Sequence, residues 1–349
     1  KMEVLTERQK LILSLVVHEY TQSAQPVGSN TLVKRYHLEM SPATVRNEMA
    51  ALTDMGYLRQ PHTSAGRIPS EEGFRYFVGR LMRETELPDS TRHMISHQFY
   101  QSPPDIDQWM RLAASVLAHQ SRAASLVTAP HPEKDLIKHI ELISTIGRQV
   151  LVVLVMVGGE VRQRIMTMTD VVSQEQLTAA AHNITQLLQG KDATAIQAAL
   201  PQLQGLEHDL THWMMQTMGE SDSIIAGDVY LDGLSNVLAE PEFFDNTEAR
   251  RALRVLEERS HLQQILTRSM LGSGIGGVQV LIGGEGAMTE LSQFSMVLAR
   301  YGSPGVVTGT LGVLGPVRMS YGRTISTVRY IAGILSDLVS ESINEEQYG

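Results

Sequence analysis

The sequence predicts a multidomain α+β protein. At 349 residues the chain is long enough for two or three domains, and its hydrophobic content of 42% is ordinary for a globular protein. The beginning of the chain is predicted to form short helices and a hairpin. The later part is predicted to be rich in strands and is interrupted by a nearly all-helical block. We therefore predict a domain at 1–86, a linker at 87–106, a strand-rich domain at 107–171 and 248–349, and an insertion at 172–247.

Composition restricts the chemistry that we expect. The sequence has no cysteine, which excludes disulfides, thiolate zinc sites and cysteine nucleophiles. It opens on no basic-then-apolar leader, and the longest apolar run, Val150 to Val157, suits a buried strand and is too short for a membrane span. We therefore expect a cytoplasmic protein that does not contact a membrane.

The charge is unevenly distributed along the chain. Residues 1–83 contain 11 Lys and Arg against 8 Asp and Glu, whereas the remaining 266 residues carry a net charge of −12. A modestly basic end on an acidic body fits a specific DNA-binding protein, because phosphate contacts are local while the body repels DNA.

The first domain is organised around a helix that is predicted to begin at Ser41. Ser41 is a good N-cap, and Pro42 suits the first helical position because it has no amide hydrogen to leave unpaired. Val45, Met49 and Leu52 recur at helical spacing and should face the core.

The opposite face of this helix is small, polar and cationic, with Ala43, Asn47 and Ala50 flanked by Thr44 and Arg46. A recognition helix needs such a surface to enter a major groove. Taken alone, the pattern is more typical of an ordinary amphipathic surface helix, because such helices commonly expose an arginine and an asparagine.

The neighbouring segments favour DNA binding. Residues 5–22 read as a helix with a capping box at Thr6 and Gln9, and residues 28–38 read as a second short helix. Gly56 should end the third helix, after which residues 57–69 read as a two-stranded hairpin. Three short helices followed by such a hairpin predict a winged helix-turn-helix.

Two long stretches resemble the HrcA family of heat-inducible transcription repressors. They are SPATVRNEMAALTDMGYLRQPHTSAGRIPSEEGFRYFV at 41–78 and GTLGVLGPVRMSYGRTISTVRYIAGILS at 309–336. The resemblance implies a GAF-like α/β domain with an inserted, mostly helical dimerisation domain. It also implies an inverted-repeat operator called CIRCE at chaperone genes, and a GroE chaperonin that keeps the repressor active.

A two-fold operator implies a homodimer, and the outward residues of the third helix and of the wing should contact DNA. Arginine commonly reads guanine and asparagine reads adenine. The expected contacts are Ser41, Thr44, Arg46 and Asn47 in the helix, and His62, Thr63, Ser64 and Arg67 in the wing.

The insertion should supply the dimer surface, because its helices carry more apolar positions than a small block is expected to bury alone. These positions are Leu177, Ile184, Leu187, Leu188, Leu203, Leu206 and Trp213.

Other motifs favour structural roles. Gly272, Gly274 and Gly277 spell GxGxxG, but a predicted helix precedes them and a strand follows, which is the reverse of a dinucleotide-binding loop. Histidines four residues apart occur at 93 and 97 and at 208 and 212, without a third zinc ligand in an obvious motif.

No nucleophile elbow or GxxxxGK loop is present, so we expect no enzyme activity, metal or cofactor. The glycine-rich stretch 302–322 suits tight turns and close strand packing, although it would also suit a ligand pocket. The alternative function is therefore a regulator that senses a small molecule through the GAF-like domain.

Overall fold

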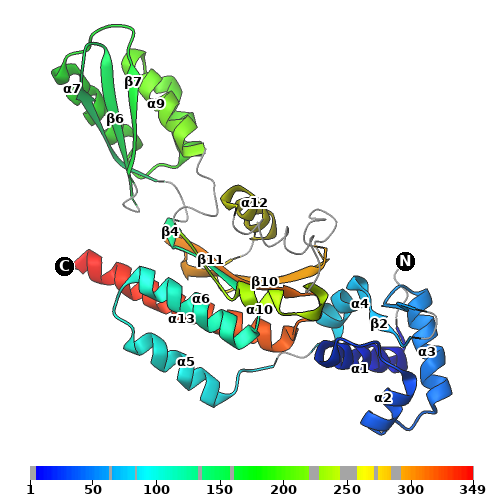
Figure 1. Cartoon of the computed structure of the whole chain (residues 1–349). Helices are drawn as coiled ribbons and strands as arrows, with labels where there is room; N and C mark the ends of the chain where they lie inside the picture. Colours follow the sequence, from blue (N-terminus) through cyan, green and yellow to red (C-terminus); the bar gives the residue numbers. More distant parts are fainter. Residues whose placement is uncertain are drawn as a thin grey trace. The chain divides into compact units, whose positions relative to one another are not determined.

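A computed structural model describes residues 5–62, 65–82, 85–132, 136–157, 161–219, 228–243, 258–270, 274–283 and 292–348. Helices and antiparallel sheets are mixed, as the predicted α+β class requires (Figure 1). The chain forms two compact units. The first comprises Lys1–Thr128, Val229–Tyr301 and Thr310–Gly349, and the second comprises Ala129–Asp228 and Gly302–Gly309.

The first unit begins with a segment of short helices and one small sheet, here called the N-terminal segment (residues 5–82). Its elements are α1 (Glu7–Ser23), α2 (Ser29–Tyr36), α3 (Pro42–Asp54), β1 (Leu58–Arg59), β2 (Ile68–Pro69), α4 (Glu71–Tyr76) and the π-helix η1 (Phe77–Leu81). The order of three helices and a two-stranded antiparallel pair is the one that the sequence predicts.

Local chemistry sets the ends of these helices as predicted. Thr6 and Gln9 form the capping box of α1, and the Ser41 side chain accepts the Thr44 amide at the start of α3. After α3, Gly56 adopts a φ of +84°, a left-handed conformation that glycine tolerates best. The turn at Gly56 lets the chain reverse into β1.

The remainder of the first unit is built on an antiparallel sheet with the strand order β8-β3-β11-β10-β9. These strands are β8 (Val229–Asp232), β3 (Ala124–Thr128), β11 (Val307–Pro316), β10 (Phe294–Ser303) and β9 (Val278–Ile282). The first residues of β11, which belong to the second unit, pair with β4 (His131–Pro132) of that unit. Strands β10 and β11 are buried along most of their length, as expected of central strands in a sheet covered on its faces.

Helices complete this part of the molecule. They are α5 (Asp89–Gln101), α6 (Ile106–Ser121), α10 (Leu234–Leu238), the short η3 (Pro241–Phe243), α12 (Arg259–Met270) and α13 (Tyr321–Tyr348). Helices α6 and α13 lie side by side along the sheet (Figure 1). Their apolar faces form the core with the strands, for example through Met110, Leu117 and Val328.

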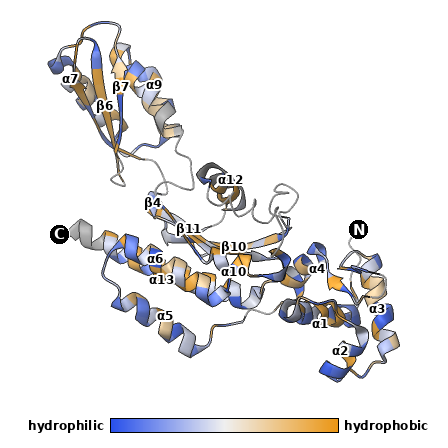
Figure 2. Cartoon of the chain, in the orientation of Figure 1, coloured by the Kyte–Doolittle hydropathy of each residue, from blue (hydrophilic) through white to orange (hydrophobic). Residues whose placement is uncertain are grey.

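The second unit contains a three-stranded antiparallel sheet and a helical layer. The strands are β5 (Ile137–Ser144), β6 (Gln149–Met156) and β7 (Val161–Thr167), and the helices are α7 (Gln174–Leu188), α8 (Ala193–Ala199), η2 (Leu200–Gln202) and α9 (Gly205–Gly219). The hydropathy colouring shows β6 as a mostly hydrophobic strand (Figure 2). Strand and helical layers share one core, so β5–β7 belong to the same compact unit as α7–α9.

The glycine motifs lie in turns and at close contacts. Gly272 is outside the described residues, and Gly274 to Gly277 form a turn between α12 and β9, so a helix precedes and a strand follows. In β11, a Cβ atom at Gly312 would lie 2.3 Å from the Val297 carbonyl oxygen, so this glycine permits close strand packing.

Candidate nucleic-acid interface

The third helix buries one face and exposes the other. Val45, Met49 and Leu52 are 0–3% exposed, whereas Arg46 and Asn47 are exposed on the opposite side. Among the described residues, no hydrogen bond or ion pair is recorded for either exposed side chain. A guanidinium and a carboxamide therefore remain available on a helix narrow enough for a major groove.

Ser41 and Thr44 are largely engaged within the helix start. The Ser41 hydroxyl accepts the Thr44 amide at 3.1 Å, and the two hydroxyls lie 2.9 Å apart. Their role is to fix the beginning of α3, and the spare hydroxyl lone pairs and protons can still serve a phosphate.

The hairpin is held against the end of α3 and against the chain before α2. The backbone groups of Arg67 and Val27 exchange two hydrogen bonds, of 2.8 and 2.9 Å. A Cβ atom at Gly66 would lie 2.3 Å from the Val27 carbonyl oxygen, so only glycine fits this contact without a shift. The base of the hairpin is thereby fixed.

Arg67 is half-buried, and its Nε donates to the Thr53 hydroxyl at 3.0 Å. The sequence predicts Arg67 only as a DNA contact in the wing, whereas the structure also bonds its side chain to α3. His62 is exposed, and its carbonyl accepts the Ala65 amide at 2.9 Å in the turn. Thr63 and Ser64 lie outside the described residues.

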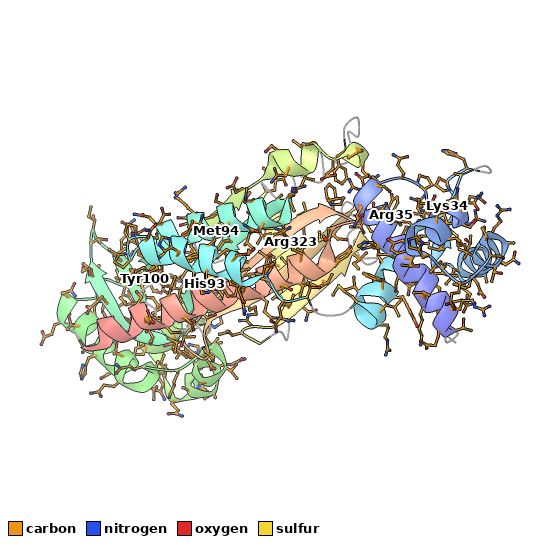
Figure 3. The ribbon with its side chains drawn as sticks, turned by 90° about the horizontal axis from the view of Figure 1, so that it is seen from below. Lys34, Arg35, His93, Met94, Tyr100 and Arg323 are labelled. Atoms are coloured by element: carbon orange, nitrogen blue, oxygen red, sulfur yellow. The ribbon has the colours of Figure 1, made fainter. Side chains whose placement is uncertain are left out.

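Two further exposed cations, Lys34 on α2 and Arg59 on β1, were absent from the expected set. Figure 3 labels Lys34 and its neighbour Arg35 at the end of α2. The sequence shows that Lys34 and Arg59 are charged and lie in the basic segment. That both side chains are exposed is known only from the structure.

A buried carboxylate joins the first two helices. Glu19 of α1 is 4% exposed; its Oε2 accepts Arg35 Nη1 at 2.9 Å and its Oε1 accepts the Tyr36 hydroxyl at 2.5 Å. Burial and the bond to Glu19 raise the pKa of Tyr36 to about 12, so its hydroxyl remains a donor at neutral pH. This contact sets the position of α2 beside α1.

The described residues include no cluster of three or more His, Asp or Glu side chains placed to hold a metal ion. Of the helices within the described ranges, none combines the length and the apolar character needed to span a bilayer.

The N-terminal segment thus presents an exposed polar helix face beside a fixed hairpin, and comparison with known proteins defines the family. A sequence model described as "HrcA protein C terminal domain" matches residues 107–325. Proteins named heat-inducible transcription repressor HrcA are similar along nearly the whole chain. The relative from Roseiflexus castenholzii is 41% identical over 345 residues, covering 97% of this chain and 95% of that relative.

Similar relatives occur in Chloroflexus aggregans, at 41% identity over 356 residues, and in Herpetosiphon aurantiacus, at 40% over 350 residues. These alignments cover 97% and 98% of this chain and 94% and 98% of the relatives. The chain belongs to the HrcA family of heat-inducible transcription repressors. Proteins of this class are normally not enzymes.

A crystal structure described as that of a hypothetical protein shares the fold with a TM-score of 0.61 and 23% sequence identity. The match covers 97% of this chain and all of that one.

Proposed function

We propose that this protein is a cytoplasmic, homodimeric repressor that binds an inverted-repeat operator at chaperone genes, with activity modulated by the GroE chaperonin. In this proposal the N-terminal segment acts as a winged helix-turn-helix. The sheet of the first unit, with its helices, is a GAF-like domain. For the inserted dimerisation domain we take the second unit, which includes β5–β7 and so differs from the insertion at 172–247 that the sequence predicts. The observation that carries the proposal is the exposure of Arg46 and Asn47 on a capped helix in a member of a repressor family.

In this proposal α3 lies in the major groove, and its exposed Arg46 and Asn47 side chains contact base edges. The hairpin contacts the backbone or minor groove through His62, Thr63, Ser64 and Arg67, while Ser41 and Thr44 lie near phosphates. Lys34 and Arg59 join them as candidate phosphate contacts because both are exposed cations of the same segment.

The test is a fluorescence-anisotropy titration of an inverted-repeat chaperone promoter at stated salt. Arg46→Ala and Asn47→Ala should each weaken operator binding by roughly 1–3 kcal/mol, because each removes a base contact. Both variants should keep the wild-type unfolding midpoint, since neither side chain is packed.

Arg92→Ala is the matched control, because Arg92 is an exposed arginine of α5 that pairs with Asp89 outside the N-terminal segment. It should leave operator affinity unchanged. Near-wild-type affinity in both α3 variants would contradict the assignment of the recognition helix.

Dimerisation is supported by an open apolar sheet face in the second unit. Cross-strand neighbours Ile143, Leu151 and Ile165 form one row on the side away from the helices. The adjacent rows contribute Val153, Val155 and Val161, with the polar side chains of His139, Glu141 and Gln163 at their ends. Ile143, Val161 and Ile165 are 46–58% exposed, which is costly for a sheet in water. A second copy meeting this face about a two-fold axis would cover it and would match an inverted repeat.

A further inference from the structure

A cavity of about 410 Å³ lies between the N-terminal segment and the start of α13. Its walls come from α1, from the π-helix η1 with the residues after it, and from residues 319–323. Small-molecule sites commonly have volumes of roughly 300–1,000 Å³. None of the residues proposed to contact DNA lines this cavity, so it is a separate site.

Part of the cavity lining is apolar. Val17 of α1, Phe77 and Leu81 of η1, and Met319 line it. The π-helix closes with a 2.7 Å hydrogen bond from the Met82 amide to the Phe77 carbonyl, and this wider turn places both Phe77 and Leu81 on the cavity wall. Such a wall suits an aliphatic or aromatic group.

The polar part of the lining consists of hydroxyl groups and basic groups. Ser14, His18 and Ser320 contribute polar side chains, and Arg323 contributes a guanidinium. The partner recorded for Arg323 is the neutral side chain of Gln120, at 3.1 Å from its Nη2. No Asp or Glu is among the described lining residues. The guanidinium of Arg323, whose partner is neutral, therefore favours an anion over a cation at this end of the cavity.

The cavity adjoins the contacts that join the N-terminal segment to the rest of the first unit. Thr21 lines the cavity, and its carbonyl accepts Arg318 Nη1 at 3.3 Å. Arg318 also pairs with the carboxylates of Glu240 and Glu242, and it directly precedes the lining residue Met319. A bound molecule would thus touch both sides of this joint.

We propose that the cavity binds a small amphipathic anion, an aliphatic or aromatic body bearing one carboxylate, and that its occupancy changes operator affinity through the joint. The binding part is independent of the proposed function, whereas the coupling part rests on it. The apolar body lies against Phe77 and Leu81, and the carboxylate lies near Arg323. Occupancy changes the separation of α1 from α13, and with it the position of the DNA-contacting helix.

Binding is tested by calorimetry on the full chain without DNA. The probes are 3-phenylpropionate, its neutral amide and the corresponding amine. The carboxylate should bind once per chain, at least about tenfold more tightly than the amide, and the amine should not bind. Figure 3 labels Arg323 on α13. Arg323→Gln should abolish the preference for carboxylate, whereas Arg329→Gln on the same helix should keep it.

A filling variant tests the location. Leu81→Trp should weaken the probe at least about tenfold, while Leu11→Trp, at an exposed α1 position outside the lining, should bind within about twofold of wild type. Unfolding midpoints establish that each variant folds. If Leu81→Trp does not fold, Arg323→Gln, which changes an exposed residue, tests whether the probe binds in this cavity. An absence of saturable binding of the carboxylate to wild type would overturn the proposed site, as would equal affinity in wild type and Arg323→Gln.

Operator titrations with and without saturating 3-phenylpropionate test the coupling. Operator affinity should change at least about threefold in wild type and Leu11→Trp, and should not change in Arg323→Gln at the same probe concentration. If calorimetry detects the probe but operator affinity is unaltered, coupling is overturned. If no sample binds the operator, the proposed function fails while the binding site stands.

Discussion

Glu19 shows how one side chain can fix the arrangement of two helices. A buried carboxylate is costly unless charged or hydrogen-bonding partners compensate its lost hydration. Arg35 supplies the charge and Tyr36 supplies a hydroxyl, both from α2. The arrangement of α1 and α2 thus depends on a polar contact as well as on the apolar core.

We predict that Tyr36→Phe lowers the free energy of unfolding by about 1–2 kcal/mol at pH 7, because Glu19 loses one of its two partners. The pKa of Tyr36 is raised from 10.0 to about 12, so the folded state favours the neutral phenol. The stabilisation is therefore complete below pH 10 and is lost as the pH rises through about 12.

Urea denaturation of wild type and Tyr36→Phe at several pH values measures this difference. The difference in unfolding free energy should be constant below pH 10 and should shrink above it. Tyr100→Phe is the control, because Tyr100 is 89% exposed and should show no difference. A Tyr36→Phe difference that persists unchanged to pH 12 would contradict the assigned contact.

Arg67→Ala should weaken operator and random DNA by similar factors and should reduce the salt slope of binding by about one unit, because a phosphate contact is lost. Arg67 also binds Thr53, so Thr53→Val is the matched control that removes this bond and keeps the guanidinium. Anisotropy titrations over a series of salt concentrations measure both effects. An unchanged slope in Arg67→Ala would leave Arg67 with a structural role only.

The sequence predicts residues correctly where the determinant is local. The Ser41 cap and the buried face of Val45, Met49 and Leu52 follow from helical spacing and from the short reach of a side-chain cap, and the structure confirms them. The bond between Arg67 and Thr53 joins residues 14 positions apart in different elements, so periodicity carries no information about it. The DNA contacts themselves remain predictions.

At the scale of elements, the second unit corrects one expectation. Leu177, Ile184 and Leu188 are 0% exposed, and Trp213 is 6% exposed, because they pack against the strands of the same unit. The prediction that these helical positions seek a partner chain was therefore wrong. The apolar surface left over belongs to the strands.

The sequence of β6 explains why the exposed face of the sheet was not predicted. Its residues are apolar on both sides, so the run from Val150 to Val157 shows no alternation from which a facing could be read. Only the pairing with β5 and β7 separates Val152 and Leu154, which face the helices, from Leu151 and Val153, which do not.

The double variant Ile143→Glu, Ile165→Glu should convert the dimer to a monomer, because both carboxylates would be buried at the proposed interface. Analytical ultracentrifugation should give a dimer dissociation constant at least about a hundredfold higher than that of wild type, and operator affinity should fall as well. Ile146→Glu is the control, because Ile146 is 82% exposed in the turn between β5 and β6. A dimeric double variant would exclude this face.

At the scale of the whole molecule, polar and aromatic contacts join the N-terminal segment to the rest of the first unit. Arg318 Nη1 donates to the Thr21 carbonyl at 3.3 Å, Arg75 Nη2 donates to the Ile282 carbonyl at 2.8 Å, and the Phe74 and Tyr321 rings lie 6.1 Å apart. The residues in these contacts are up to 297 positions apart in the chain, so no sequence pattern predicts them. Repression by the proposed dimer requires that two sets of contacts remain formed. These are the contacts between the N-terminal segment and the rest of the first unit, and the contacts between two copies at the exposed face of β5–β7.

Heat should therefore inactivate the protein by raising the population of partly unfolded chains whose apolar surfaces aggregate. A protein of ordinary, marginal stability, about 5–15 kcal/mol, needs no dedicated temperature sensor for this response. After a brief heat pulse, we predict that operator binding falls and light scattering rises. GroE chaperonin with ATP during recovery should restore binding, whereas GroE without ATP should not.

The control is Arg92→Ala, which lies outside the proposed interfaces and should respond to heat and chaperonin as wild type does. The Ile143→Glu, Ile165→Glu variant should lose binding before heating and gain none from chaperonin, because its defect is association and folding is intact. Full operator binding after the pulse without chaperonin would contradict the stability argument. Recovery that is equal with and without ATP would contradict modulation by the chaperonin, because release of a refolded chain would then need no ATP-driven step.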